Sequence, residues 1–161
     1  GTAELSERLG VAIEGPREDG LVLVNGLDEH STRPGFESAR SFVPTHWLKD
    51  GDTVSFGNEI KTVHHCPSHT PGHVVFSGAK DKEAIVGDVL FRSSVGRSDL
   101  LGGDRATLIR SIRDKLWLLG DETTFVPGHG PLPAFGHERQ SNPFVSDHLF
   151  SRRLSNPCSM K

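Results

Sequence analysis

The segment His64-His65-Cys66-Pro67-Ser68-His69-Thr70-Pro71-Gly72-His73 decides how this chain is interpreted. Two of its histidines, His69 and His73, stand four residues apart, a spacing that would place them on one face of an α-helix. The prolines and the glycine inside the segment exclude a helix, so we expect a turn in which the two imidazoles need not point the same way. Taken alone, the turn fits two interpretations. Either one histidine binds a metal ion while the other supports the loop, or both are polar surface residues.

Two further segments place ligand-type residues directly after expected strands. Residues 84–88 (AIVGD) end in Asp88, whose carboxylate can project from a sheet edge, although alone it is more typical of a turn or a cap. Residues 125–131 (FVPGHGP) hold His129 between glycines and prolines, although alone it is more typical of an exposed loop histidine. Together the three segments give the order His, Asp, His, and imidazoles with a carboxylate suit Zn²⁺ or Fe²⁺.

The surrounding sequence predicts a mixed α and β domain. A helix is expected over residues 2–9 with Gly10 as its stop, and a second helix begins after Asp104 and ends at Gly120. Strands are expected over residues 11–13, 52–56, 59–63, 73–76, 83–86 and 123–126, with Gly57-Asn58 forming a hairpin turn. Residues 17–30 fit either a strand or a helix.

Composition excludes several functional classes. With 161 residues, 34% of them hydrophobic, one globular domain is expected. The net charge of −3 argues against nucleic acid and anionic lipid as partners, and no apolar run approaches the roughly 20 residues of a membrane helix. Two cysteines, Cys66 and Cys158, argue against a disulfide scaffold and favour the cytoplasm. The chain opens with Gly1 and its one methionine is Met160, so we expect a processed or partial chain.

In combination, the motifs resemble those of the metallo-β-lactamase superfamily, and most closely its compact glyoxalase-II-like (hydroxyacylglutathione hydrolase-like) members. The matching motifs are His69-Thr70-Pro71-Gly72-His73, Gly87-Asp88, Gly96-Arg97-Ser98-Asp99, Pro127-Gly128-His129-Gly130, Glu138-Arg139 and Asn142-Pro143-Phe144. The resemblance covers about residues 2–147. It implies the α+β class and a four-layer αβ/βα sandwich, with residues 1–148 as a partial domain and 149–161 as a tail.

The resemblance also implies the roles of individual residues. His69 would bind one metal ion, His129 the second, and the catalytic Asp88 would bridge both. His73 would support the loop behind these ligands. Arg97 stands where such proteins place a basic residue near the glutathione part of the substrate, although a surface arginine fits equally well. The residues His64, His65 and Cys66 match no ligand.

The implied function is a metal-dependent hydrolase that cleaves glutathione thioesters of the S-lactoylglutathione type. Two divalent ions, with zinc preferred and iron or manganese compatible, would hold a bridging hydroxide that attacks the acyl carbon. Lactones and β-lactams also remain open as substrates. One alternative is an iron-dependent persulfide dioxygenase, but those relatives carry His-Asp-Tyr in the last motif and this chain contains no tyrosine. Another alternative is a non-catalytic remnant.

One departure from the family pattern changes the expectation for this chain. The leading motif H-x-H-x-D-H, which would supply two further ligands to each metal, is not found in the 161 residues. We therefore expect the chain to start just downstream of that motif, without the first strands of the sandwich. Such a piece would bind metal weakly, would be inactive by itself, and would expose apolar sheet surface and strand edges.

Overall fold

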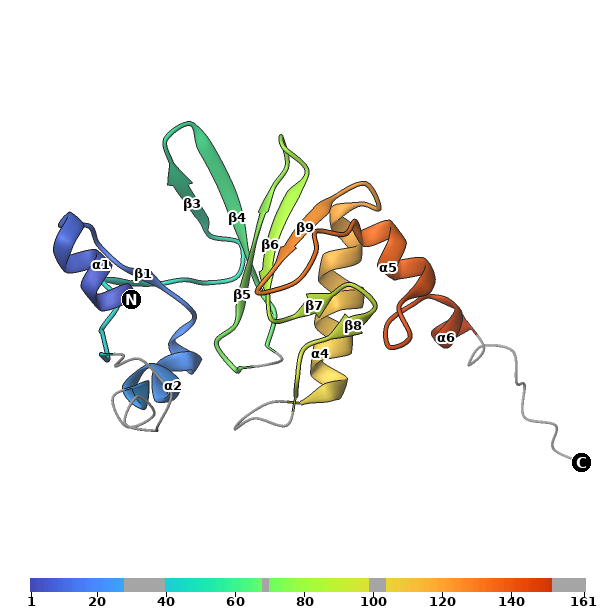
Figure 1. Ribbon diagram of the computed structural model, residues 1–161, viewed down its shortest axis with the longest axis horizontal. Helices are drawn as coiled ribbons and strands as arrows, with labels where there is room; N and C mark the ends of the chain where they lie inside the picture. Colours follow the sequence, from blue (N-terminus) through green and yellow to red (C-terminus); the bar gives the residue numbers. More distant parts are fainter. Residues whose placement is uncertain (28–39, 68–69, 99–103, 152–161) are drawn as a thin grey trace, which may run out of the picture.

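A five-stranded sheet forms the centre of the computed structural model, which describes residues 1–27, 40–67, 70–98 and 104–151. The strands are β3 (Thr53–Phe56), β4 (Glu59–His65), β5 (Val74–Gly78), β6 (Glu83–Gly87) and β9 (Thr124–Pro127). They lie in the order β3-β4-β5-β6-β9 and are antiparallel, except for the parallel β6–β9 pair (Figure 1). The five strands expected at these positions are confirmed, with ends shifted by one or two residues.

The β3–β4 hairpin follows from its turn residues. Gly57 has a φ of 58°, a left-handed conformation that costs glycine little, and the pairing places Phe56 opposite Glu59. Such a positive φ suits the two-residue turn that Gly57-Asn58 predicts. Because the turn fixes the register, it also determines which residues of β4 face the core.

The long helical segment after residue 104 begins and ends where the sequence predicts. It comprises α4 (Arg105–Ser111), a π-helical turn η2 (Ile112–Leu116) and a 3₁₀ turn η3 (Trp117–Leu119). The Asp104 carboxylate accepts hydrogen bonds from the backbone N–H groups of Thr107 and Ala106, at 2.7 and 3.4 Å, and so caps the helix. Gly120 ends the segment with a φ of 96°.

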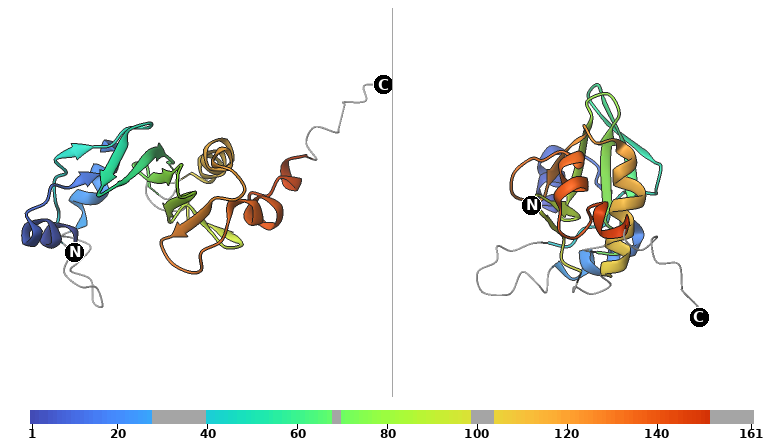
Figure 2. Two further views of the ribbon diagram at one scale, coloured as in Figure 1. Left: turned by 90° about the horizontal axis from the view of Figure 1, so that it is seen from above. Right: turned by 90° about the vertical axis from the view of Figure 1, so that its right-hand side faces the viewer.

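The core lies between this helical segment and one face of the sheet. Figures 1 and 2 show α4 running alongside β6 and β9. The cluster of buried residues draws on both layers: it contains Val75, Ala84, Val86 and Phe125 from the sheet and Leu108, Ile112, Leu116 and Trp117 from the helix. The packing of these side chains holds the carboxyl ends of β6 and β9 at a fixed place.

The opposite face of the sheet carries apolar side chains that are only partly covered. Phe76, Ile85 and Val126 are cross-strand neighbours on this face, and Ile85 is 39% exposed. Phe56 and Ile60 of the β3–β4 hairpin are also exposed. The expected apolar sheet surface is therefore observed.

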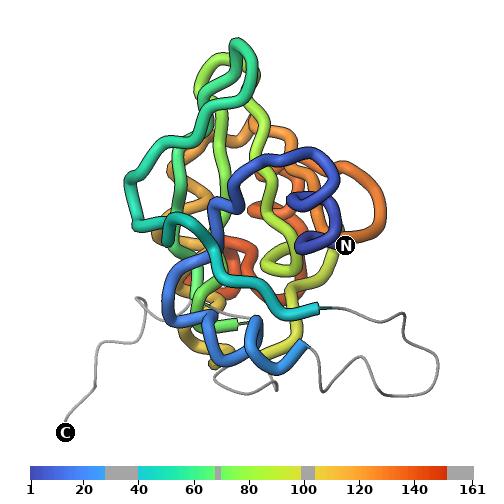
Figure 3. Tube along the Cα trace, turned by 90° about the vertical axis from the view of Figure 1, so that its left-hand side faces the viewer, coloured from blue at the N-terminus to red at the C-terminus, as the bar shows by residue number. Residues whose placement is uncertain are grey.

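The N-terminal segment lies on the β3–β4 side of the sheet (Figures 1 and 3). It contains α1 (Thr2–Leu9), η1 (Glu18–Gly20), α2 (Leu21–Asn25), and strand β1 (Glu14–Gly15), which pairs in parallel with β2 (His46–Trp47). Helix α1 and its left-handed Gly10 stop are as expected.

The expected strand over residues 11–13 is wrong, because the β-ladder begins only at Glu14. Val11 instead donates its N–H to the carbonyl oxygen of Ser6, in the last turn of α1. The ambiguous run at residues 21–24 is helical. Its β-branched residues suit a strand by type, but they follow directly on the 3₁₀ turn η1, which starts a helix.

Strands β1 and β2 were not predicted, nor were the hairpin strands β7 (Leu90–Phe91) and β8 (Ser94–Val95) or the helices α5 (Phe135–Ser141) and α6 (His148–Ser151). Each is too brief to show a hydrophobic period. Among the described residues, no helix combines the length and the apolar character needed to cross a membrane. The α+β class is confirmed.

Candidate metal centre

Asp88 and His129 meet at one edge of the sheet. Each follows the carboxyl end of a strand, β6 or β9, and these two strands are parallel neighbours. The Gly128 N–H donates to the Gly87 carbonyl over 3.0 Å, which closes the gap between the two loops. A Cβ added to Gly128 would lie only 2.1 Å from Asp88 Oδ1. The carboxylate therefore lies directly against the backbone of the residue that precedes His129.

His73 joins the neighbouring loop to the same strand end. Its Nε2 lies 3.0 Å from the Val86 carbonyl oxygen and must donate, since a carbonyl only accepts. A Cβ on Gly87 would come within 3.2 Å of the His73 ring, so that glycine makes room for the imidazole. His73 thus holds the backbone directly before Asp88. The other histidine of this turn, His69, lies outside the described residues, and its role as a ligand stays a prediction.

The residues at this edge fit one part of a metal centre. A carboxylate and an imidazole, brought together by parallel strands, are a donor pair that suits Zn²⁺ or Fe²⁺. Within the described ranges, no group of three or more His, Cys, Asp or Glu side chains is arranged to hold a metal ion. The described part of the chain therefore contributes two candidate ligands, Asp88 and His129.

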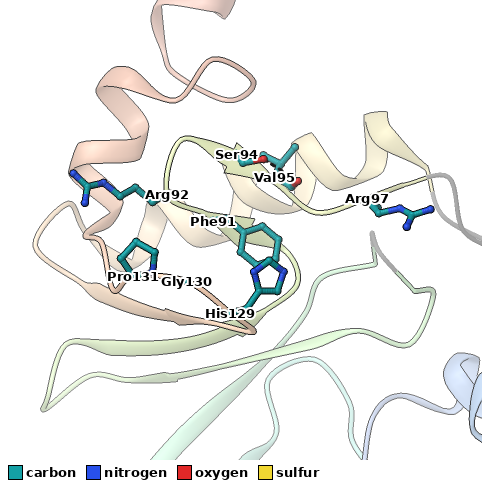
Figure 4. Close-up of a pocket in the computed structure, with 8 residues that line it drawn as sticks. All are labelled: Phe91, Arg92, Ser94, Val95, Arg97, His129, Gly130 and Pro131. Atoms are coloured by element: carbon teal, nitrogen blue, oxygen red, sulfur yellow. Dashed lines mark hydrogen bonds between the residues drawn. The ribbon is translucent and has the colours of Figure 1, made fainter. Parts of the chain in front are cut away.

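Phe91 fixes the His129 ring, and sequence reasoning missed it. The two rings stack with centroids 4.4 Å apart and planes 24° from parallel, as Figure 4 shows. Phe91 belongs to β7, only three residues after Asp88. Because His129 itself is exposed, this stacking contact restricts an imidazole that would otherwise rotate. An aromatic residue close behind the Gly-Asp strand end was the available sequence signal.

A pocket of about 420 Å³ opens beside the stacked pair. Its described lining comes from the β7–β8 hairpin and the His129 loop: Phe91, Arg92, Ser94, Val95, Arg97, His129, Gly130 and Pro131. Figure 4 shows Arg92 and Arg97 on opposite sides of the Phe91–His129 pair. Guanidinium groups bind anions such as carboxylates, so the lining includes two residues that suit an anionic ligand. The structure therefore places Arg97 and His129 at one pocket.

His65 is a second residue whose role was not predicted from the sequence: it supports the turn that leads into His73. Its Nε2 donates to the Pro71 carbonyl oxygen at 2.8 Å, which leaves Nδ1 to accept from Arg17 Nη1 at 3.3 Å. Arg17 also donates its backbone N–H to the Gly72 carbonyl. The N-terminal segment and His65 thus brace the turn that leads into His73. Adjacent His64 is half-buried, hydrogen-bonded to Ser77, and burial lowers its pKa.

Cys66, which matches no ligand in the sequence, is a packed thiol. The side chain is fully buried in the core cluster, and burial raises its pKa to about 12. Since a metal-binding cysteine is a thiolate, a thiol that stays protonated at neutral pH is a poor ligand. Cys66 therefore contributes packing rather than chemistry.

We expect Gly72→Ala to destabilise the protein by about 1–3 kcal/mol, because the added methyl group overpacks a rigid contact. Its Cβ would lie 2.5 Å from the Gly20 nitrogen and 2.7 Å from the Arg17 carbonyl oxygen, both backbone atoms that cannot rotate away. Urea unfolding measures the loss. Gly1→Ala is the matched control, because a Cβ there meets nothing within 4 Å. Equal stability of the two variants would contradict the close packing.

Comparison with known proteins agrees with this geometry. The family model described as the Metallo-beta-lactamase superfamily matches residues 1–129. The chain is 38% identical over 144 residues to the hydroxyacylglutathione hydrolase GloC of Haemophilus influenzae, covering 89% of this chain and 68% of GloC. It covers less than half of several other curated relatives.

Two solved structures extend the comparison. The structure of TTHA1623 in a di-iron-bound form superposes with a TM-score of 0.79 and 36% identity, covering 89% of this chain and 69% of that one. The structure of ETHE1 from Myxococcus xanthus gives a TM-score of 0.67 at 23% identity, covering 97% of this chain and 64% of that one, and this likeness concerns the fold alone.

The chain belongs to the metallo-β-lactamase superfamily. Its homology supports a hydrolase with a metallo-β-lactamase fold. Membership of this superfamily implies that divalent metal ions are bound.

Proposed function

We propose that the protein hydrolyses thioesters of glutathione, of the S-lactoylglutathione type. The observation that carries the proposal is a pocket lined by His129 and two arginines, with the Asp88 carboxylate against the Gly128 backbone directly before His129. The relationship to the hydroxyacylglutathione hydrolase GloC supports the same substrate class. A glutathione thioester offers a carbonyl for hydrolysis and two carboxylates for recognition by cations.

Each residue of the site has a separate role in the proposed reaction. Asp88, His129 and His69, which lies outside the described residues, would hold the divalent metal ions. Such ions lower the pKa of water and polarise a carbonyl, which makes a serine or cysteine nucleophile unnecessary. Phe91 keeps the His129 ring in one orientation, and the hydrogen bond from His73 to Val86 holds the backbone of the Asp88 loop.

Arg97 orients the substrate in this proposal. Its guanidinium group can form paired hydrogen bonds with a carboxylate of the glutathione moiety. Such contacts at the rim would keep the acyl carbon over the Asp88–His129 pair. We further propose zinc as the preferred metal, with iron and manganese compatible; the di-iron form of TTHA1623 is the example of iron on a similar scaffold.

The domain extent and the location belong to the same proposal. In this proposal, residues 1–148 of the chain form a partial catalytic domain and residues 149–161 form a tail. A cytoplasmic location accords with the low cysteine content and with a glutathione-derived small molecule as the partner.

Thioester hydrolysis by the full-length protein tests the proposal. We expect loss of the thioester absorbance of S-lactoylglutathione, dependent on added Zn²⁺ and abolished by a chelator. The same preparation is offered glutathione persulfide while dissolved oxygen is recorded. Oxygen uptake without thioester cleavage would overturn the proposal in favour of a persulfide dioxygenase. Inactivity towards both substrates in a metal-loaded protein would overturn it as well.

A further inference from the structure

Glu138 and Asn142 are buried polar residues that the metal chemistry does not use. They lie on α5 and directly after it, four residues apart, and both are fully buried. Both belong to motifs that the sequence analysis singled out and the proposed mechanism leaves without a role. A buried carboxylate is costly unless its hydrogen bonds are made, so its partners identify its purpose.

The partners of both residues lie at the tip of the β7–β8 hairpin. Glu138 Oε2 accepts hydrogen bonds from the Ser93 N–H and from Asn142 Nδ2, each at 2.8 Å. Asn142 Nδ2 also donates to the Ser94 carbonyl over 3.1 Å. The two side chains therefore hold one backbone donor and one backbone acceptor in the hairpin turn, more than forty residues away in sequence.

The hairpin needs this support, because its own sequence does not specify its turn. Ser93 has a φ of 58°, a left-handed conformation that is unfavourable for a non-glycine residue. The ladder consists of only two pairs, Leu90 with Val95 and Phe91 with Ser94. An isolated two-stranded hairpin of this kind is marginally stable at best.

The hairpin in turn carries one wall of the candidate site. Phe91 stacks on His129, and the pocket-lining Arg92, Ser94 and Val95 follow within four residues. The end of the hairpin at Gly96 lies directly against the backbone of Asp88, since a Cβ on Gly96 would lie 1.9 Å from the Asp88 carbonyl oxygen. A displaced hairpin would move the ring that orients His129 and change the pocket at the same time.

We propose that Glu138 and Asn142 are positioning residues that set the place of the β7–β8 hairpin, and through Phe91 the orientation of the His129 imidazole. Their effect on catalysis rests on the proposed function of His129, whereas their effect on ring stacking does not. The two residues touch neither the pocket nor the candidate ligands in this role. They act through the Ser93 and Ser94 backbone.

The chain offers a conservative variant for the test. Glu138 Oε1 is buried and has no hydrogen-bond partner among the described residues, although His137 Nε2 lies 3.9 Å from it. Glutamine can therefore keep both accepted hydrogen bonds through its carbonyl oxygen and place its amide nitrogen at the unpartnered position. Alanine removes both bonds. Glu138→Gln should consequently behave like the unaltered protein where Glu138→Ala does not.

The first readout is the NMR signal of the His129 ring in the metal-free, full-length protein. Stacking on Phe91 shifts the imidazole protons upfield, and Phe91→Leu gives the unstacked reference. We expect Glu138→Ala to move the His129 signals towards that reference, while Glu138→Gln leaves them in place. Asn142→Ser, which removes the bond to the Ser94 carbonyl, serves as a second variant should Glu138→Ala fail to fold.

The second readout is metal affinity and kcat/KM of the full-length protein. We expect a fall of about 10- to 100-fold in Glu138→Ala, the range typical of residues that orient a ligand, and recovery in Glu138→Gln. Val63→Ala is the control for lost stability, because Val63 is fully buried in β4 and lies outside the core cluster that contains Leu90 of the hairpin. It should lower the melting temperature without shifting the His129 signals.

Two results would overturn the positioning role: His129 signals unchanged in both Glu138→Ala and Asn142→Ser, or Glu138→Gln as impaired as Glu138→Ala. A protein that cleaves no thioester but shows the expected NMR shifts would refute the proposed substrate and leave the positioning role supported.

Discussion

Asp88→Ala in the full-length protein is expected to abolish binuclear metal binding and to lower hydrolysis by about 10³-fold or more. A bridging carboxylate is the one protein ligand that two metal ions share, so its removal affects both. Metal ions supply several kcal/mol of transition-state stabilisation, and each 1.36 kcal/mol corresponds to a tenfold change in rate. Elemental analysis of the purified variant gives the metal content per chain, and the thioester assay gives the rate.

The control for this variant is Asp114→Ala, which removes an exposed carboxylate in η2 and should retain metal and rate. Two metal ions retained per Asp88→Ala chain would refute the bridging role. Loss of metal in both variants would point instead to a general effect of lost negative charge, and would refute a specific role for Asp88.

Gly128→Ala is expected to have the second-largest effect, with a 10²-fold or greater loss of activity at nearly unchanged stability. The new methyl group would overlap Asp88 Oδ1, at 2.1 Å, whereas the next nearest atoms lie at 3.2 Å or more. The overlapping atom is a side-chain tip, so the fold can accommodate the methyl group by rotating the carboxylate. A displacement of about 1 Å within a catalytic constellation is enough for a loss of this size.

Thermal unfolding and metal titration together check this separation of effects. We expect Gly128→Ala to unfold close to the temperature of the unaltered protein while binding metal much more weakly. Leu132→Ala, an exposed side chain in the same loop, should change neither property. Unaltered metal affinity in Gly128→Ala would show that the position of the Asp88 carboxylate does not matter.

The parts of the fold that could be predicted are those with local causes. The β3–β4 hairpin follows from a turn whose glycine takes a positive φ, and the helix after residue 104 follows from its Asp104 cap. The β7–β8 hairpin and α5 have no such local cause. Ser93 adopts its turn conformation because Glu138, 45 residues later, holds it there. No short segment of the sequence contains both Ser93 and Glu138, so a local sequence pattern does not predict this turn.

The candidate site divides in the same way. Asp88 and His129 could be predicted because each ends a recognisable strand, and their proximity follows from the parallel pairing of β6 and β9. The contribution of Phe91 depends on how a short hairpin folds back over the His129 loop, and that of His65 on the packing of Arg17. His69 stays a prediction from its motif, because it lies outside the described residues.

The left-handed backbone at Ser93 has a consequence for how this family's sequences vary. A glycine at position 93 would adopt the same turn without strain, and so would weaken the demand for a buried carboxylate at position 138. The two positions should therefore covary among relatives: glutamate accompanies a non-glycine turn, and its loss is tolerated mainly beside glycine. Sequence change at one position of α5 is thereby constrained by a single backbone dihedral angle in the β7–β8 hairpin.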